Sequence, residues 1–252
     1  MRVPFGRPGH SSTPSFNIHF LSESAVTIEF GQEIDEITFN RVHQLDELVN
    51  RLPFEGFIAT VPAYTSLAIF YDTIQVVQAK QLYGLNSFER ISNYLIELQQ
   101  QAIPINEIKK EPIHLPICYE EELGPDLAYV ASYHNISTQE LIKLHSSTTY
   151  KVYMIGFVPG FAYLGGTPSL LETPRKKIPR KQVPAGSVGI AGKQTGIYPL
   201  EISGGWQIIG CTPLRLFDIN RSSPSLLRAG DEVIFDTIDL REFKRLRRSN
   251  ES

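Results

Sequence analysis

Five basic residues crowd one short stretch of this chain that prolines interrupt, TPRKKIPRKQVPAG at positions 173–186. Proline restricts the unbound chain, so such a loop loses less entropy when it closes on an anion. Arg175 and Arg180 each follow a proline, and a guanidinium binds carboxylate or phosphate through paired hydrogen bonds. The stretch therefore predicts an anion-binding loop, with a solvated basic loop as the equal alternative.

Glycines and aromatic residues lie on both sides of this loop. Residues 154–166 are MIGFVPGFAYLGG, and residues 184–210 are PAGSVGIAGKQTGIYPLEISGGWQIIG. Glycine serves either a tight barrel corner or a ligand that lies against the main chain. Phe157, Phe161 and Tyr163 would supply an apolar wall next to accessible N–H groups, which is the usual make-up of a small-molecule pocket. The segment thus predicts the floor and rim of such a site.

Three near-matches to known motifs fail at specific points. AGKQ at 191–194 ends like a P-loop, but Gln194 stands where the magnesium-binding Ser or Thr belongs. AGSVG at 185–189 lacks the first glycine of a nucleophile elbow, and the glycine-rich segment has no histidine to act as a base. The glycines also lack the strand-to-helix context of a dinucleotide site. With no HExxH or CxxC pattern, no metal site is predicted.

The composition narrows the class of protein. The 252 residues carry 24 basic and 27 acidic side chains, a net charge of −3, which gives no reason to expect nucleic acid or an anionic membrane as a partner. No run approaches the roughly 18 apolar residues of a membrane span. Residues 1–14 lack a secretory signal and predict a flexible leader. Cys118 and Cys211 alone make no disulfide framework, so a cytoplasmic location is expected.

Regular periodicity organises the first hundred residues. Side-chain alternation predicts strands at 16–20, 25–30, 56–61 and 66–71, and helical spacing predicts helices at 33–52 and 88–101. A strand at 112–117 would close the unit. The order β-β-α-β-β-α-β predicts an α+β layer with both helices on one face of a sheet, interpreted mainly as a structural or interface domain.

Beyond a linker at residues 102–112, the pattern changes to short strands between Gly and Pro turns. Two helices are expected first, one with Pro125 as its first helical residue and one that begins at Ser137, whose spacing to Glu140 predicts a capping box. Strands are then predicted at 151–158, 187–192, 196–202, 206–212 and 231–238. Many short strands favour a β-barrel or sandwich, and the basic tail at 241–252 favours a solvated helix end.

The glycine-rich half also carries a family resemblance. IGFVPGFAYLGG and TPRKKIPRKQVPAGSVGIAGKQTGIYPLEISGGWQIIGCTPLRLFD closely resemble the family called allophanate hydrolase subunit 1, carboxyltransferase domain subdomain C, or KipI. Upstream, LPICYEEELGPDLAYVASYHNIS and VPAYTSLAIFYD are similar to its middle section and N-domain, so the resemblance covers most of the chain. The chain departs from the family at Cys211, where a basic residue is expected, and at Thr167, where an apolar residue is common.

The resemblance implies a fold, a reaction and partners. The implied fold class is α+β: a ferredoxin-like domain at 15–103, then a cyclophilin-like β-barrel domain at 112–245. The best-understood bacterial members are the B subunit of an ATP-dependent 5-oxoprolinase, which opens 5-oxoproline to L-glutamate with ATP, together with Mg²⁺, as cosubstrate. The implied partners are the C subunit, of the allophanate hydrolase subunit 2 family, and the A subunit of that enzyme. The isolated chain is expected to be inactive.

The candidate residues take roles in lactam opening under this resemblance. Arg175 and Arg180 would bind the substrate carboxylate or a phosphate. Tyr163, Tyr198 and Trp206 would form the wall of the site. Because phosphorylation of the amide oxygen would supply the leaving group, the protein would contribute positioning and charge stabilisation, and no nucleophile is required.

Polar contacts to the lactam or the nucleotide are expected from five further positions: Lys193, Gln194, Thr195 and the main chain at Gly160 and Gly192. The residues expected to be catalytic are Arg180, Lys193 and Gln194. His145 is a weaker candidate, for which a structural role is the stronger hypothesis.

Two other functions stay open. One is a KipI-like inhibitor of a sensor histidine kinase, which would bind a helix bundle and turn over no substrate. The other is a carboxyltransferase subunit related to urea carboxylase and allophanate hydrolase, which would need a biotinylated partner. Family analogy alone carries both.

Overall fold

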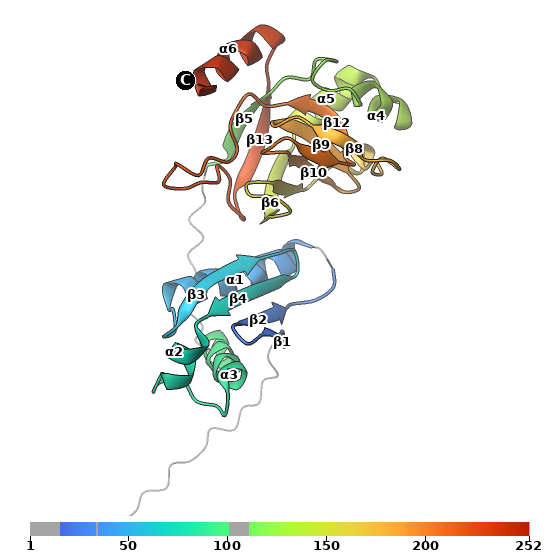
Figure 1. Ribbon diagram of the computed structural model, residues 1–252. Coiled ribbons are helices and arrows are strands. Elements are labelled where there is room, and N and C mark those ends of the chain that lie inside the picture. The colour runs from blue at the N-terminus through green and yellow to red at the C-terminus, as the bar shows by residue number, and fades with distance from the viewer. Residues whose placement is uncertain (1–15, 34, 101–110, 252) are drawn as a thin grey trace, which may run out of the picture. The chain divides into compact units, whose positions relative to one another are not determined.

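The chain forms two separately packed units, Met1–Asn106 and Glu107–Ser252. The computed structural model describes residues 16–33, 35–100 and 111–251 of them (Figure 1). Each unit has its own sheet and its own apolar core. The α+β class expected from the sequence is confirmed.

Two sequence predictions lie outside the described residues. These are the flexible leader at 1–14 and nearly all of the linker at 102–112. Within the described ranges, no helix is long and apolar enough to cross a membrane.

Four antiparallel strands form the N-terminal sheet in the order β1-β2-β4-β3: β1 (Asn17–Ser22), β2 (Ala25–Glu29), β3 (Phe57–Pro62) and β4 (Ser66–Tyr71). Helix α1 (Glu36–Arg51) connects β2 to β3, and β4 lies between those two strands. This split β-α-β arrangement is the centre of a ferredoxin-like sheet. The outer strand next to β2 comes from the N-terminal hairpin.

Amphipathic spacing places the helices of this unit on one face of the sheet. Helix α1 begins after Asp35, whose carboxylate accepts the Thr38 N–H at 2.7 Å. Its buried face packs on β3 and β4, where alternate residues such as Leu67 and Ile69 are fully buried. Helix α3 (Ser87–Gln100) was predicted, but the short helix α2 (Thr73–Gln78), capped by the Asp72 side chain, was not.

Seven strands form the sheet of the second unit in the order β12-β9-β10-β7-β6-β13-β5: β5 (Ile113–Ile117), β6 (Thr149–Ile155), β7 (Ala162–Gly165), β9 (Ser187–Ala191), β10 (Gln194–Ile197), β12 (Gln207–Cys211) and β13 (Glu232–Thr237). Its two edge strands meet at Cys118 and Cys211, which exchange main-chain hydrogen bonds of 2.9 Å each way. The sheet is therefore a nearly closed barrel. A two-stranded sheet, β8 (Arg180–Val183) with β11 (Ile202–Gly204), accompanies it.

The strand predicted at 112–117 exists, but it does not close the N-terminal unit. As β5 it pairs in parallel with β13, from Ile113 opposite Val233 to Ile117 opposite Thr237. That prediction of its place was wrong because element order alone does not say which distant strand will pair. The structure assigns β5 to the barrel.

Two helices follow β5 and precede the other barrel strands, and both were expected. Helix α4 (Leu127–Tyr133) begins after Asp126, so the placement of Pro125 as the first helical residue was wrong. Helix α5 (Thr138–Ser146) begins with the predicted capping box, in which the Ser137 and Glu140 side chains each bond to the other's N–H. The basic tail forms helix α6 (Leu240–Glu251).

Candidate functional site

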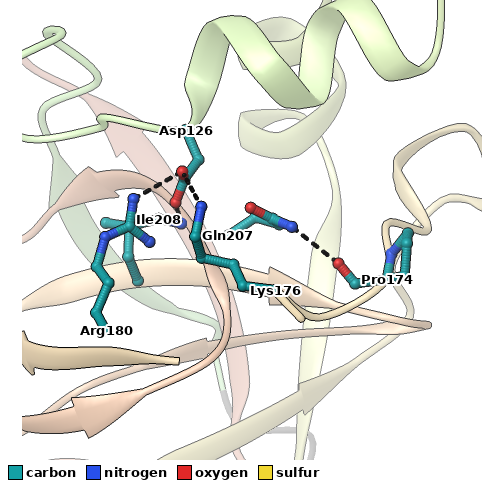
Figure 2. Close-up of polar contacts among 6 residues, drawn as sticks. All are labelled: Asp126, Pro174, Lys176, Arg180, Gln207 and Ile208. Carbon is teal, nitrogen blue, oxygen red and sulfur yellow. Dashed lines mark hydrogen bonds and ion pairs between the residues drawn. The ribbon is translucent and has the colours of Figure 1, made fainter. Parts of the chain in front are cut away.

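The basic loop is tied to the barrel at several main-chain points. The Gly192 N–H donates to the Thr173 carbonyl at 2.7 Å, and the Lys176 N–H donates to the Gly205 carbonyl at 2.7 Å. Between them, the Gln207 amide donates to the Pro174 carbonyl at 3.0 Å (Figure 2). These bonds hold the start of the loop against the β9–β10 turn and β12.

Asp126 is the buried anchor of the basic side chains. Its Oδ1 accepts from Arg180 Nη2 at 2.7 Å and from Lys176 Nζ at 3.0 Å, and its Oδ2 accepts the Ile208 N–H at 2.7 Å (Figure 2). The residue is only 4% exposed. Burial acts to raise the pKa of this carboxyl, but Arg180, Lys176 and the Ile208 N–H outweigh it and hold the pKa below its usual range.

Arg175 lies in a different environment from these two cations. Its guanidinium carbon is 5.8 Å from the ring centroid of Trp206, within the range of a cation–π contact. It is exposed, and with the described residues it forms no hydrogen bond or ion pair. Burial raises the pKa values of Tyr163 and Tyr198, and the Arg175 charge acts in the opposite direction on both. The Arg175 charge therefore acts on both tyrosines of the aromatic wall, and its guanidinium contacts the tryptophan.

The aromatic wall is a cluster of rings around Phe161. Its centroid lies close to those of Tyr163 (4.7 Å), Tyr198 (5.1 Å) and Trp206 (5.5 Å). Phe157 contacts Phe161 at 5.8 Å, is 62% exposed and has a φ of 70°, a left-handed conformation that is unusual for a bulky residue. The predicted wall residues Tyr163, Tyr198 and Trp206 are thus brought together with Arg175, but Tyr198 (1% exposed) and Trp206 (4% exposed) are buried in the cluster, and of the three only Tyr163 is partly exposed.

This cluster lies on the outer face of the barrel wall, separate from the barrel core. Along β12, Ile208 packs into the aromatic cluster and the next residue, Ile209, packs into the core. Along β10, a Cβ on Gly196 would lie 2.9 Å from the Trp206 ring, while the preceding Thr195 faces the core. Successive residues of a strand face opposite sides of the sheet. Neighbouring residues of β10 and β12 therefore belong alternately to the aromatic cluster and to the barrel core.

Thr195 is therefore not brought together with Arg175. It is fully buried, and its hydroxyl donates to the Gly189 carbonyl at 3.0 Å. The same hydroxyl lies 3.0 Å from His145 Nε2, so it accepts the Nε2 proton. The hydroxyl of Tyr119, 2.8 Å from Nδ1, then donates to the other ring nitrogen.

His145 is held neutral at the centre of this buried chain of hydrogen bonds. Its ring stacks on Phe235 at 4.7 Å, and burial lowers its pKa to about 3. Since both ring nitrogens have partners, the structural role that the sequence favoured for His145 fits this geometry.

The remaining predicted residues lie at the edges of the cluster or away from it. Gly192 and Lys193 form the exposed two-residue turn between β9 and β10, and Gly192 has a φ of 57°. Gln194 follows and is half-buried. Gly160 is buried with a φ of 82°, and a Cβ there would lie 2.7 Å from Phe217 Cβ, so its backbone conformation and its packing both require a glycine.

Cys211, the departure from the family pattern, lies in the barrel seam. It is 3% exposed, and its burial raises the pKa of the thiol to about 12. Cys118 opposite is also a free, buried thiol. Position 211 therefore carries no charge in this chain. Among the described residues, no group of three or more His, Cys, Asp or Glu side chains could hold a metal ion.

Asp126 is the site residue that sequence analysis missed. The pattern placed it inside a helix after Pro125, where an acidic residue is common. The available signal was a short acidic side chain at a helix start, the usual position of an N-cap. In the structure its carboxylate makes no capping bond and is directed to the basic loop instead.

These features define a class of protein with an α+β unit followed by a barrel that carries a basic loop and an aromatic cluster on its outer face. Comparison with known proteins then gives the family. The family model "Carboxyltransferase domain, subdomain C and D" matches residues 16–227, and this chain belongs to that family.

Similar proteins include two named relatives and a crystal structure. The B subunit of 5-oxoprolinase from Bacillus subtilis (strain 168) is 42% identical over 231 residues, which cover 92% of this chain and 96% of the relative. The B subunit of 5-oxoprolinase from Escherichia coli O157:H7 is 37% identical, over 86% of this chain and 94% of the relative. The crystal structure of TTHA0988 matches with a TM-score of 0.73 and 34% identity over 85% of this chain. This chain spans only 40% of TTHA0988.

Proposed function

We propose that this chain is the B subunit of an ATP-dependent 5-oxoprolinase, which opens 5-oxo-L-proline to L-glutamate in a complex with a C subunit and an A subunit. The observation that carries the proposal is the 42% identity to a 5-oxoprolinase B subunit, which extends over 96% of that relative. A match over nearly the whole length of both chains includes the barrel, the basic loop and the N-terminal unit.

The chemistry of the outer-face site suits a small carboxylate with a flat ring. A five-membered lactam is a weak electrophile. Phosphorylation of its amide oxygen by ATP would activate the carbonyl carbon, so that water can attack it and open the ring. The protein then needs to position the lactam and stabilise charge. Arg175 would take the carboxylate and the half-buried Tyr163 would lie against the ring, while Tyr198 and Trp206, 1% and 4% exposed, would support this wall from behind.

In this proposal the nucleotide binds at the neighbouring β9–β10 turn. Lys193 and Gln194 would contact its phosphates, with Gly192 leaving the turn uncovered, since a Cβ there would meet nothing within 4 Å. Mg²⁺ would bind with the nucleotide, whose phosphate oxygens and waters are its usual ligands. Gly160 and Thr195, which were also predicted to contact substrate, act in this proposal through packing and the His145 network.

Reconstitution of the complex tests the proposal. The chain is co-expressed with its C-subunit and A-subunit counterparts, and release of L-glutamate from 5-oxoproline is measured with and without ATP. We expect ATP-dependent release that disappears when this chain is omitted. Arg180→Ala is expected to lower turnover more than about tenfold, since it removes a charged hydrogen bond to a buried carboxylate. No release from a fully assembled complex would reject the proposed function.

A further inference from the structure

The two arginines of the basic loop differ in what they contact. Arg180 shares the Asp126 carboxylate with Lys176, and its side chain is 26% exposed. Arg175 is exposed beside Trp206 and has no ion-pair partner among the described residues. Loop sequence alone would make the two equivalent, because each follows a proline.

We propose that Asp126 is a positioning residue, which fixes the basic loop so that Arg175, and not Arg180, binds the carboxylate of the substrate. This assignment rests on the proposed function and deepens it. Arg180 and Lys176 then hold the loop in position through their bonds to Asp126 and do not contact the substrate.

The contacts of Asp126 explain how it can position a residue that it does not contact. One carboxylate oxygen holds the Lys176 and Arg180 cations, while the other accepts the Ile208 N–H from β12. The main chain of Asp126 also donates to the Ile208 carbonyl at 2.8 Å. Lys176 and Arg180, which lie two residues before and two residues after Ile178, are thereby both linked through Asp126 to β12. Arg175, directly before Lys176, is held with its guanidinium over Trp206.

The environment of Arg175 selects the class of ligand. A single guanidinium without a protein partner can form a planar, bidentate pair with one carboxylate. Trp206 beneath the guanidinium is only 4% exposed, so the half-buried Tyr163 ring, 5.8 Å from it, is the aromatic surface that a ligand would meet beside Arg175. A small monocarboxylate with a planar ring, such as a lactam acid, matches both features.

A double-mutant cycle on the reconstituted complex tests this inference. The variants are Arg175→Gln, Asp126→Asn and the two combined. Each is assayed for the KM of the lactam substrate, 5-oxoproline, and for inhibition by 2-pyrrolidone, the same lactam without the carboxylate. We expect Arg175→Gln to raise the KM at least about tenfold, the usual loss for a charged hydrogen bond. The inhibition constant of 2-pyrrolidone should stay within about twofold, since it never used that contact.

Asp126→Asn should raise the KM in the same direction, again with little change for 2-pyrrolidone. The double variant should be no worse than Arg175→Gln alone, because both changes remove the same contact and are not additive. A merely structural role would weaken both ligands equally. Equal weakening, additive effects, or a KM insensitive to Arg175→Gln would each overturn the proposal.

Two controls separate folding and function from positioning. Asp218→Asn removes a comparable loop carboxylate, which pairs with Arg215 at 3.2 Å, and should leave the KM unchanged. If Asp126→Asn does not fold, Lys176→Met removes one of its two cationic partners, and the KM should still rise selectively for 5-oxoproline. Failure of the proposed function is recognisable separately, because the wild-type complex itself would then release no glutamate.

Discussion

The two units of this chain differ in where they keep their polar groups. In the described part of the N-terminal unit, the buried polar residues are Thr38 and Ser87. In the barrel unit the buried polar residues are more numerous: Asp126, His145, Thr173, Ser187, Thr195, Gln207, Thr212 and Asp231. Apolar packing therefore dominates the first core, whereas buried hydrogen bonds have a larger part in the second.

Strand burial accounts for this difference. In β4 every second residue is buried, so one face lies against the helices and the other is more open. In β9 and β12 all five residues are buried, because the barrel core covers one face and the aromatic cluster covers the other. The barrel wall therefore carries a second apolar cluster outside its core, whereas the first sheet packs its helices against one face.

The largest expected effect tests the apolar core of the N-terminal unit. Ile69→Ala leaves a cavity at a fully buried position and should cost about 2–5 kcal/mol of unfolding free energy. The loss should be equal at acid and neutral pH, since it comes from packing. Urea unfolding followed by circular dichroism at both pH values measures it.

Ile58→Ala is the matched control, because that side chain on β3 is 63% exposed. It should change stability by less than about 0.5 kcal/mol. A loss of the same size at both positions would contradict the apolar-core description.

The pH dependence of the barrel tests its buried polar network. The folded pKa of His145 is about 3, below the unfolded value near 6.5. As pH falls, the unfolded chain takes up the proton first, so the stabilisation is complete above about 6.5 and is lost toward pH 3. Between pH 6.5 and 5, the barrel should lose about 2 kcal/mol, at about 1.4 kcal/mol for each pH unit.

Trp206, the chain's single tryptophan, reports barrel unfolding by fluorescence. His145→Gln should abolish most of this pH dependence. His19→Gln, at an exposed histidine of the other unit, should keep it. If the unfolding free energy of wild type and of His145→Gln fell equally with pH, His145 would not be the source of the pH dependence.

The smallest expected effect concerns a local contact that the sequence alone predicted. Ser137→Ala removes the hydroxyl that accepts the Glu140 N–H at 3.1 Å, and should cost about 1 kcal/mol of barrel stability. Thermal unfolding measures it, with Ser132→Ala on the exposed part of α4 as control. A neutral Ser137→Ala would show that tertiary packing, and not the cap, fixes the start of α5.

Much of the fold followed from local sequence signals. Period-two and helical spacing located β2, β4, α1 and α3, and the Ser137 capping box marked the start of α5. The short strands β7 and β8 were missed, since four residues are too few to show a period. The pairing of β5 with β13 was also unpredictable, because about 120 residues separate the two strands.

The site was partly visible in the sequence. Arg175, Tyr163, Tyr198 and Trp206 were expected together, and the structure groups them. Thr195 was expected with them, but it lies on the other face of β10. A shift of one position along the strand moves a side chain from the aromatic cluster to the barrel core. Residue type does not assign a side chain to one face of a strand when both faces are buried.

By itself, the sequence of this protein determined most of its helices and strands, its family and the residue types of the candidate site, because these can be recognised from neighbours a few positions apart. Only the tertiary structure decided which of two equivalent arginines pairs with a buried carboxylate and which lies exposed over Trp206. The reason is that Asp126, 54 residues before Arg180 in the chain, reaches it only once the barrel has closed.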